Sequence, residues 1–134
     1  MRLVDNSQLE RLYEQAKVSE RKRSHLLLHR SHQDKVQRLI IAMVKGSYVE
    51  PHYHELDYQW EMFTVLQGVV NVTLYTQEGD VLHSYKAGPE EVASIIEFAP
   101  GDIHSVECLS ATSLMIEVKE GPFNPAFAKA HPEW

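Results

Sequence analysis

The chain has 134 residues, about the size of one domain, and its 43% of hydrophobic residues is enough for a single packed core. The net charge of −6 argues against non-specific attraction to nucleic acid or to an anionic membrane. One cysteine excludes an intramolecular disulfide framework, and no apolar run approaches the roughly 20 residues of a membrane span. With no secretory signal at the N-terminus, we expect a soluble cytoplasmic protein.

The first predicted element is an N-terminal helix within residues 7–23. Ser7 and Glu10 have the spacing of a capping box. The apolar residues that follow recur at helical spacing along one face: Leu9, Leu12, Tyr13 and Ala16. The basic cluster at residues 21–23 is interpreted as charge that is favourable near the C-terminus of this helix, with an anion site as the alternative.

From residue 36 onward the pattern changes to short strands separated by turns that contain glycine or proline. The predicted strands are VQRLIIAMV, YVEPHYH, EMFTVLQG, VVNVTLY, VLHSYKA, ASIIEFA, SVECL and TSLMIEVK. Many short strands with one helix predict a compact antiparallel sandwich or barrel.

Two histidines stand one residue apart in the second predicted strand. Because alternate residues of a strand project from the same face, His52 and His54 can converge on one ion. Glu61 opens the next strand after a six-residue connection, so a hairpin would return its carboxylate to the pair. His104 follows a glycine turn far downstream, and only a closed sheet would place it beside the others. Imidazole and carboxylate groups suit a transition metal, and the alternative is a His-rich surface loop.

The sequence around these residues resembles the two motifs of the cupin superfamily. The first motif is matched by Gly46, His52, His54, Glu61 and Gly68, and the second by Pro100, Gly101 and His104. The resemblance implies an all-β fold, a small jelly-roll barrel with one N-terminal helix. It also implies that three histidines and one glutamate hold one divalent metal ion, such as Zn, Fe, Ni or Mn. The connection between His54 and Glu61 is longer than in most cupins, and it adds Tyr58 and Trp60 at the pocket mouth.

Five segments extend the resemblance to the WbuC-type cupin-fold metalloproteins, which are often encoded among lipopolysaccharide O-antigen genes: DKVQRL, SYVEPHYH, WEMFTVLQG, PGDIH and EVKEGPFNP. This resemblance implies a sugar or nucleotide-sugar derivative as the small-molecule substrate, with oxygenation or isomerisation as possible reactions. The alternatives are a non-catalytic module that binds or senses a carbohydrate or small acid, and an assembly protein stabilised by its metal. By analogy with cupins we expect a homodimer.

One domain is expected, with a lead-in at residues 1–33, the barrel at 34–120 and a tail at 121–134 that packs on the barrel exterior or on a partner subunit. Tyr58, Trp60, Arg38 and Cys108 are candidate pocket residues. Arg38 is either an outward charge or an anion clamp. Cys108 is in phase with His104 and either lines the cavity or is a buried structural thiol.

Several other polar residues are given structural interpretations. Glu117 and Lys119 are expected on an outward polar face of the last strand. The histidines without a partner at ligand spacing are expected to be solvated or hydrogen-bonded: His25, His29, His32, His83 and His131. Of these, His29 has the best claim to the pocket wall.

Overall fold

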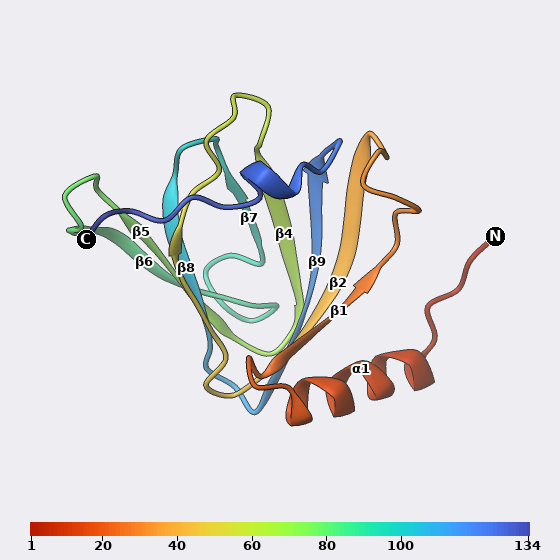
Figure 1. Ribbon diagram of the computed structural model, residues 1–134. Helices are drawn as coiled ribbons and strands as arrows, with labels where there is room; N and C mark the ends of the chain where they lie inside the picture. The colour runs from red at the N-terminus through yellow and green to blue at the C-terminus, as the bar shows by residue number, and fades with distance from the viewer.

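In the computed structural model, which describes residues 1–134, two antiparallel sheets face each other and one helix lies outside them (Figure 1). The five-stranded sheet has the order β1-β2-β9-β4-β7, and the four-stranded sheet has the order β3-β8-β5-β6. The strands are β1 (Arg23–Leu27), β2 (Val36–Val44), β3 (Tyr48–His52), β4 (Glu61–Gln67), β5 (Val70–Tyr75), β6 (Val81–Ala87), β7 (Ile95–Phe98), β8 (Ile103–Cys108) and β9 (Thr112–Glu120). The predicted all-β jelly roll with one N-terminal helix is confirmed.

The helix α1 (Asn6–Val18) is shorter than predicted and is capped by different residues. The Asp5 side chain accepts a hydrogen bond from the Gln8 backbone N–H at 2.9 Å, and the Gln8 side chain accepts one from the Asp5 N–H at 3.0 Å. The helix ends at Val18 because Ser19 is extended and Lys22 adopts a positive φ of 57°. No helix is long and apolar enough to cross a lipid bilayer.

The chain that follows this turn is the strand β1 rather than the end of the helix. β1 pairs antiparallel with β2, and Arg23 lies opposite Met43. The basic cluster at residues 21–23 therefore does not stand at a helix C-terminus. Arg23 is instead the first residue of an edge strand of the five-stranded sheet.

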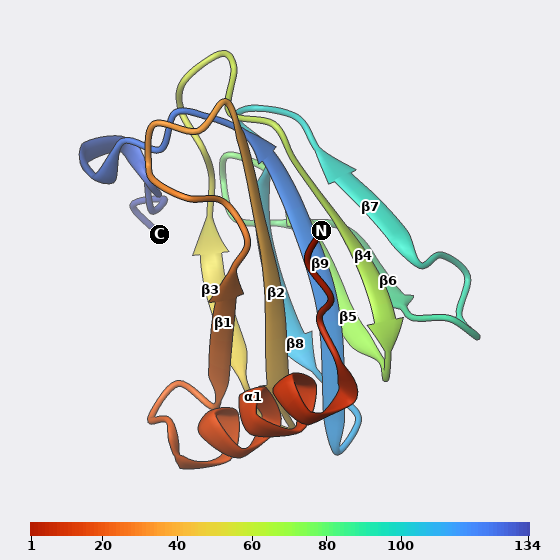
Figure 2. The same ribbon diagram turned by 90° about the vertical axis from the view of Figure 1, so that its right-hand side faces the viewer.

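The five-stranded sheet is covered on its outer face at β1, β2 and β9, because α1 lies across these strands (Figure 2). Leu12 and Ala16 of the helix pack against the outer face of the sheet, on Ile40, Ala42 and Leu114. The residues between them in sequence face the barrel interior, where Leu39, Ile41, Met43 and Met115 join the main core. Burial on both faces explains the continuous apolar run in β2.

The helix also reverses the expected orientation of the polar residues in β9. Glu117 and Lys119 were expected to face outward, and this expectation is wrong. Both line the cavity inside the barrel, because Ile116 occupies the helix-covered face and alternate residues point the other way.

The C-terminal segment crosses the open end of its own barrel (Figure 1). It contains a short 3-10 helix, η1 (Pro125–Phe127), and then forms an isolated bridge in which Tyr53 and Ala130 exchange two backbone hydrogen bonds of 2.9 Å. At its end the Trp134 ring packs on Tyr75, with 5.4 Å between ring centroids. The C-terminal segment therefore places some of its own residues at the mouth of the barrel.

Candidate metal centre

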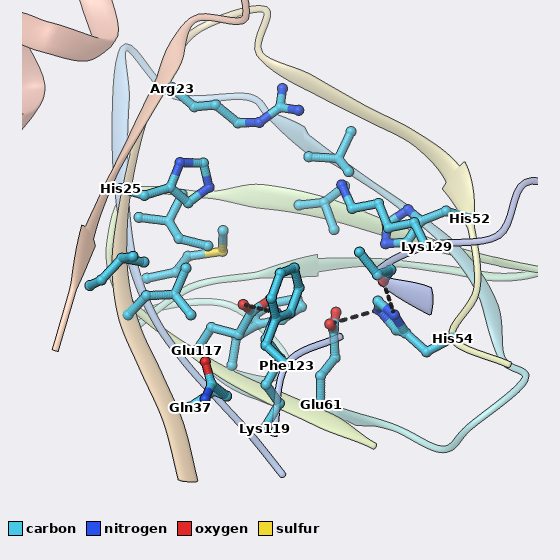
Figure 3. A pocket seen from close by; sticks show the side chains of 18 of the residues that line it. Arg23, His25, Gln37, His52, His54, Glu61, Glu117, Lys119, Phe123 and Lys129 are labelled. Atoms are coloured by element: carbon cyan, nitrogen blue, oxygen red, sulfur yellow. Dashed lines mark hydrogen bonds and ion pairs between the residues drawn. The ribbon is translucent and has the colours of Figure 1, made fainter. Parts of the chain in front are cut away.

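His52, His54, Glu61 and His104, the predicted ligands, lie together at the open end of the barrel, between the two sheets. Figure 3 shows three of them, His52, His54 and Glu61, with the Glu61 carboxylate directed toward His54. Their potential ligand atoms all lie within 4.8 Å of one another, and all four residues are buried. The topology explains the convergence: His52 in β3 pairs directly with His104 in β8, and Glu61 is the first residue of β4 on the opposite sheet. We refer to these four residues as the His3Glu cluster.

Hydrogen bonds to backbone carbonyls orient all three imidazoles. The Nδ1 atoms lie near carbonyl oxygens as follows: His52 near Glu50 at 2.8 Å, His54 near Ala128 at 2.8 Å, and His104 near Asp102 at 2.9 Å. Because a carbonyl oxygen can only accept, each Nδ1 must carry a proton and donate. The Nε2 atom of each ring is then the one left to offer a lone pair to a metal.

The carboxylate of Glu61 lies against two of these nitrogens. Its Oε2 is 2.9 Å from His54 Nε2, and its Oε1 is 3.2 Å from His104 Nε2. Burial alone would raise the pKa of Glu61, but the hydrogen bond to His104 and the charges of the His104 and His54 imidazoles outweigh burial and hold its pKa well below the usual range. The oxygens therefore belong to a carboxylate, the form that binds a metal.

The cluster fits a cation at its centre. Despite its distance of 2.9 Å from the carboxylate, the buried Nε2 of His54 makes no hydrogen bond of acceptable geometry. Burial, together with the charge of His104, lowers the pKa of His52 to about 3, so that ring is neutral at pH 7. Three nitrogens and one carboxylate form a donor set suited to a divalent transition metal.

Aromatic packing holds the cluster in place from behind. The ring of His104 stacks on Phe98 with 3.6 Å between centroids and 10° between planes. His52 and His104 are 4.4 Å apart by the same measure. Ligand side chains held by both packing and hydrogen bonds need little reorganisation when a metal binds.

A cavity of about 500 Å³ adjoins the cluster inside the barrel. This volume is in the range of small-molecule sites. Its walls combine apolar side chains such as Leu39 and Phe63 with four cationic ones from the turn before β1, from β1, from β9 and from the C-terminal segment: Arg21, Arg23, Lys119 and Lys129. The four ligands occupy one side of this space, so a molecule in the cavity would contact them directly.

Glu117 is a cavity residue that sequence reasoning missed. Its buried carboxylate lies 3.5 Å from the ammonium of Lys119. Burial and the negative charge of Glu61 raise the pKa of Glu117, and the charge of Lys119 opposes them. The signal that could have revealed it was the apolar run of β2, which indicates a sheet covered on its outer face.

The candidate pocket residues do not meet around the cavity. Arg38 is outside it, because even-numbered residues of β2 face outward, and its guanidinium lies 3.9 Å from Asp34. Cys108 is on the same face of β8 as His104 but is buried in the apolar core. Trp60 lines a small crevice beside His54 at the mouth. The Tyr58 hydroxyl donates to the Pro122 carbonyl at 3.5 Å and lines neither space.

The unassigned histidines divide into two groups. His25, His29 and His32 line the cavity, whereas His83 and His131 do not. None of the five belongs to the His3Glu cluster. Arg23 was missed as a cavity residue because it was predicted to end the helix, and His25 because it has no partner at ligand spacing.

Comparison with protein families gives one match. A family model described as "Domain of unknown function (DUF6016)" matches residues 4–87. This range includes three members of the His3Glu cluster and ends before His104. None of the curated protein sequences matches the chain significantly.

Solved structures with similar folds include a protein described as a member of the cupin superfamily. A cupin superfamily protein from Desulfitobacterium hafniense DCB-2 has a TM-score of 0.56 and 17% identity, over 73% of this chain and 76% of that chain. The capsular polysaccharide assembling protein CapF from Staphylococcus aureus has a TM-score of 0.70 and 20% identity, over 87% of this chain and only 33% of that chain. An oxalate oxidase in complex with the substrate analogue glycolate has a TM-score of 0.61 and 14% identity, over 81% of this chain and 55% of that chain. At these identities the likeness shows the cupin fold.

Proposed function

We propose that this chain, which belongs to the DUF6016 family of unknown function and has the cupin fold, is a metalloprotein that acts on a small molecule. One divalent transition metal is held by the Nε2 atoms of His52, His54 and His104 and by the carboxylate of Glu61. The observation that supports this proposal best is that four buried residues bring potential ligand atoms within 4.8 Å of one another. The Nδ1 atom of each histidine in the cluster already donates a hydrogen bond to a backbone carbonyl, so Nε2 is left for the metal.

The cavity next to the cluster favours catalysis over a purely structural metal. Structural sites are closed by their protein ligands, whereas catalytic sites keep a position open to substrate. A metal held here supplies Lewis-acid polarisation or, with iron or nickel, redox chemistry. Apolar side chains, among them Phe63 and Leu39, form part of the cavity wall and would favour the apolar parts of a ligand. Glu117, whose pKa is raised by burial, can hold or release a proton at its carboxyl oxygens. Metal-assisted oxygenation and isomerisation are the reaction classes that these groups can support.

The proposed substrate is a sugar or nucleotide-sugar derivative of polysaccharide metabolism. Five sequence segments that resemble WbuC-type cupins, proteins of O-antigen gene clusters, support this assignment. The fold likeness to CapF, described as a capsular polysaccharide assembling protein, is in keeping with it. The WbuC-type relationship is part of the same proposal.

The alternative is a metal-dependent module that binds or senses a carbohydrate or small acid without turnover. The ion pair between Glu117 and Lys119 favours this alternative, because a paired carboxylate is a weaker base. Consumption of oxygen or formation of product in the presence of a panel of sugars would show that the protein is an enzyme. Saturable binding of the same compounds without product would decide for the module.

Metal analysis of purified variants tests the site. His52→Ala, His54→Ala and His104→Ala should each lose most of the bound metal, and Glu61→Gln should lose less because an amide oxygen can still coordinate. His83→Ala removes an exposed histidine of β6 outside the cluster and should retain full metal content. Stoichiometric metal in all three cluster histidine variants would refute the proposal.

We propose a homodimer that pairs through the edge strand β6. The terminal segments pack on their own barrel, whereas β6 is exposed from Val81 to Lys86 and carries the apolar residues Leu82 and Tyr85 on its surface. An unpaired edge of this kind invites pairing with a second copy. A dimeric mass at tens of micromolar that Leu82→Glu converts to a monomer would support this arrangement. A monomeric wild type would exclude it.

Residues 1–134 are proposed to fold as one domain. The packing of α1 on the five-stranded sheet and of the tail on β3 and β5 supports this organisation. A single cooperative unfolding transition, seen alike by circular dichroism and tryptophan fluorescence, is the expected result. Two resolved transitions would contradict it.

A further inference from the structure

Three basic side chains from distant parts of the sequence line one region of the cavity. Arg21 follows the helix, Arg23 begins β1, and Lys129 belongs to the C-terminal segment. Figure 3 shows the Arg23 and Lys129 side chains pointing into the cavity from different elements. All three also line a groove of about 600 Å³ that adjoins the edge strands β1 and β3. We call Arg21, Arg23 and Lys129 the cavity cations.

The cavity cations have no ion pair with any carboxylate. Among the cationic residues of the cavity, only Lys119 has such a partner, Glu117. The one side-chain hydrogen bond of the three is from Arg23 to the Arg21 carbonyl, at 3.3 Å. Glu20 and Glu50 line the outer groove, but neither is within ion-pair distance of a cavity cation, and the Glu50 side chain is 72% exposed.

The absence of counter-ions is not explained by composition, since the chain has 19 acidic and 13 basic residues. The three cations also act on one another: burial lowers the pKa of Lys129, and the charges of Arg23 and Arg21 lower it further, while the smaller effects of Glu61 and Glu117 oppose them. Burial and the charge of Arg21 likewise lower the pKa of Arg23. Like charges gathered without a partner repel, and an anion placed among them would relieve that repulsion.

We propose that the cavity cations form a subsite for an oxyanion, a carboxylate or phosphate group carried by the small-molecule ligand. This inference rests on the proposed function, because the remainder of the ligand then reaches the His3Glu cluster in the same cavity. A guanidinium can bind such a group through two parallel hydrogen bonds, and an ammonium adds a further charge-assisted one. The subsite narrows the ligand class to acidic sugars, sugar phosphates and similar small anions, and it discriminates against neutral sugars.

The position of the cations also provides a route for the ligand. The groove beside β1 and β3 meets the cavity at the cavity cations. A positive region on a protein of net charge −6 would attract a small anion to this opening in particular. The same residues would then hold the anion once it is bound.

Calorimetric titration of the purified protein with its metal tests the subsite, with three probes: D-galacturonate, D-galactose and inorganic phosphate. Galacturonate differs from galactose in carrying a carboxylate. We expect galacturonate and phosphate to bind, and galactose to bind at least about tenfold more weakly, since galactose lacks the carboxylate that forms charge-assisted hydrogen bonds with the cavity cations. Arg23→Gln and Lys129→Gln should each weaken the binding of both anions by about tenfold or more.

Matched controls are Arg11→Gln on the helix and Lys86→Gln on β6, which remove the same charges from exposed positions outside both spaces. Both should bind the anions like the wild type. Unchanged affinity in Arg23→Gln and Lys129→Gln, equal binding of galactose, or no binding of either anion to the wild type would overturn the subsite. Binding of phosphate without galacturonate would support it and point to a phosphorylated ligand.

Metal content measured on the same samples separates the two proposals. Arg23→Gln and Lys129→Gln should keep their metal while losing anion affinity. If the two variants lose metal together with anion binding, the cations have a structural role and the subsite is refuted. If the wild type binds the anions but never holds a metal, the metal function alone fails.

Discussion

Strand β8 connects two regions of the barrel in which burial has opposite consequences. His104, near one end of the strand, and Cys108, at the other, project from the same face and are each only 1% exposed. At the end that carries the turns after β2, β4 and β8, which we call the closed end, Cys108 is enclosed by apolar side chains such as Met43 and Val65. At the open end His104 faces Glu61 across the His3Glu cluster.

The difference lies in how polar atoms are satisfied. The Cys108 thiol donates to the Ser110 carbonyl at 3.3 Å and accepts from the Ser113 hydroxyl at 3.3 Å, so nothing further is needed there. In the cluster each imidazole is satisfied at Nδ1, while the Nε2 atoms face a carboxylate. Burial at the closed end therefore stabilises the fold, whereas burial at the open end maintains a site for a cation.

The largest expected effect is at the closed end. Met43→Ala, which truncates a side chain with no exposed area, should lower the free energy of unfolding by about 2–5 kcal/mol because it leaves a cavity. Metal content per folded protein should not change. Urea unfolding of the metal-free protein and elemental analysis measure the two effects. Loss of metal from a folded Met43→Ala protein would erase the distinction between the two ends.

Metal removal should act on the open end alone. A chelator should lower the melting temperature of the wild type, because metal present at 100–1,000 times its Kd contributes about 3–4 kcal/mol. His104→Ala, which lacks a ligand, should melt at the same temperature with and without the chelator. A chelator effect of equal size in His104→Ala would place the stabilising metal elsewhere.

Truncation of the tail should have a smaller effect on the same site. Deleting residues 128–134 removes the Ala128 carbonyl that orients His54, and metal affinity should fall by about 10–100-fold. Deleting only residues 132–134 removes Trp134 from Tyr75 but leaves that carbonyl, and it should preserve affinity. Competition with a metal indicator dye measures both. Equal affinity of the two truncated proteins would exclude this role for the tail.

The smallest effect concerns His25, a residue of β1 that lines the cavity and is exposed by its accessible surface. Burial and the charges of Arg23, Arg21, Lys129 and Lys119 lower its pKa to about 4. In the unfolded chain the same ring takes up a proton near pH 6.5, so protons favour unfolding below that pH. Stability should fall as the pH decreases from about 6.5 to about 4, and His25→Gln should reduce that dependence.

Titration of the His25 ring by NMR checks this directly. Arg23→Gln removes the charge that contributes most to lowering the pKa of His25, so this pKa should rise in the variant. Binding of phosphate to the cavity cations should also raise the pKa of His25. A pKa near 6.5 in the wild type would show that the field in the cavity is not positive.

The sequence predicted the ligands because their spacing is local and periodic. His52 and His54 lie two residues apart in a strand, and Glu61 begins the next one. The remote ligand, His104, was identified through the resemblance to a two-motif family, since no local pattern relates residues so far apart. The fold class followed from the same strands and turns.

The sequence could not predict how far along the barrel axis each inward-facing residue lies, or which face of the sheet the helix would cover. Cys108 has the phase of His104, but phase alone does not distinguish a cavity wall from the core. Glu117 appeared to face outward until α1 was placed on the other side of β9. Arg23 was missed because β1 contains only five residues and follows a helix without a glycine or proline to mark the boundary.

Diffraction data collected at the absorption edge of the native metal, from crystals of the metal-loaded protein, test the central claim most directly. The account predicts one anomalous peak within about 2.0–2.3 Å of the three Nε2 atoms and of a Glu61 oxygen. A metal bound elsewhere, with the four side chains uncoordinated, would contradict it.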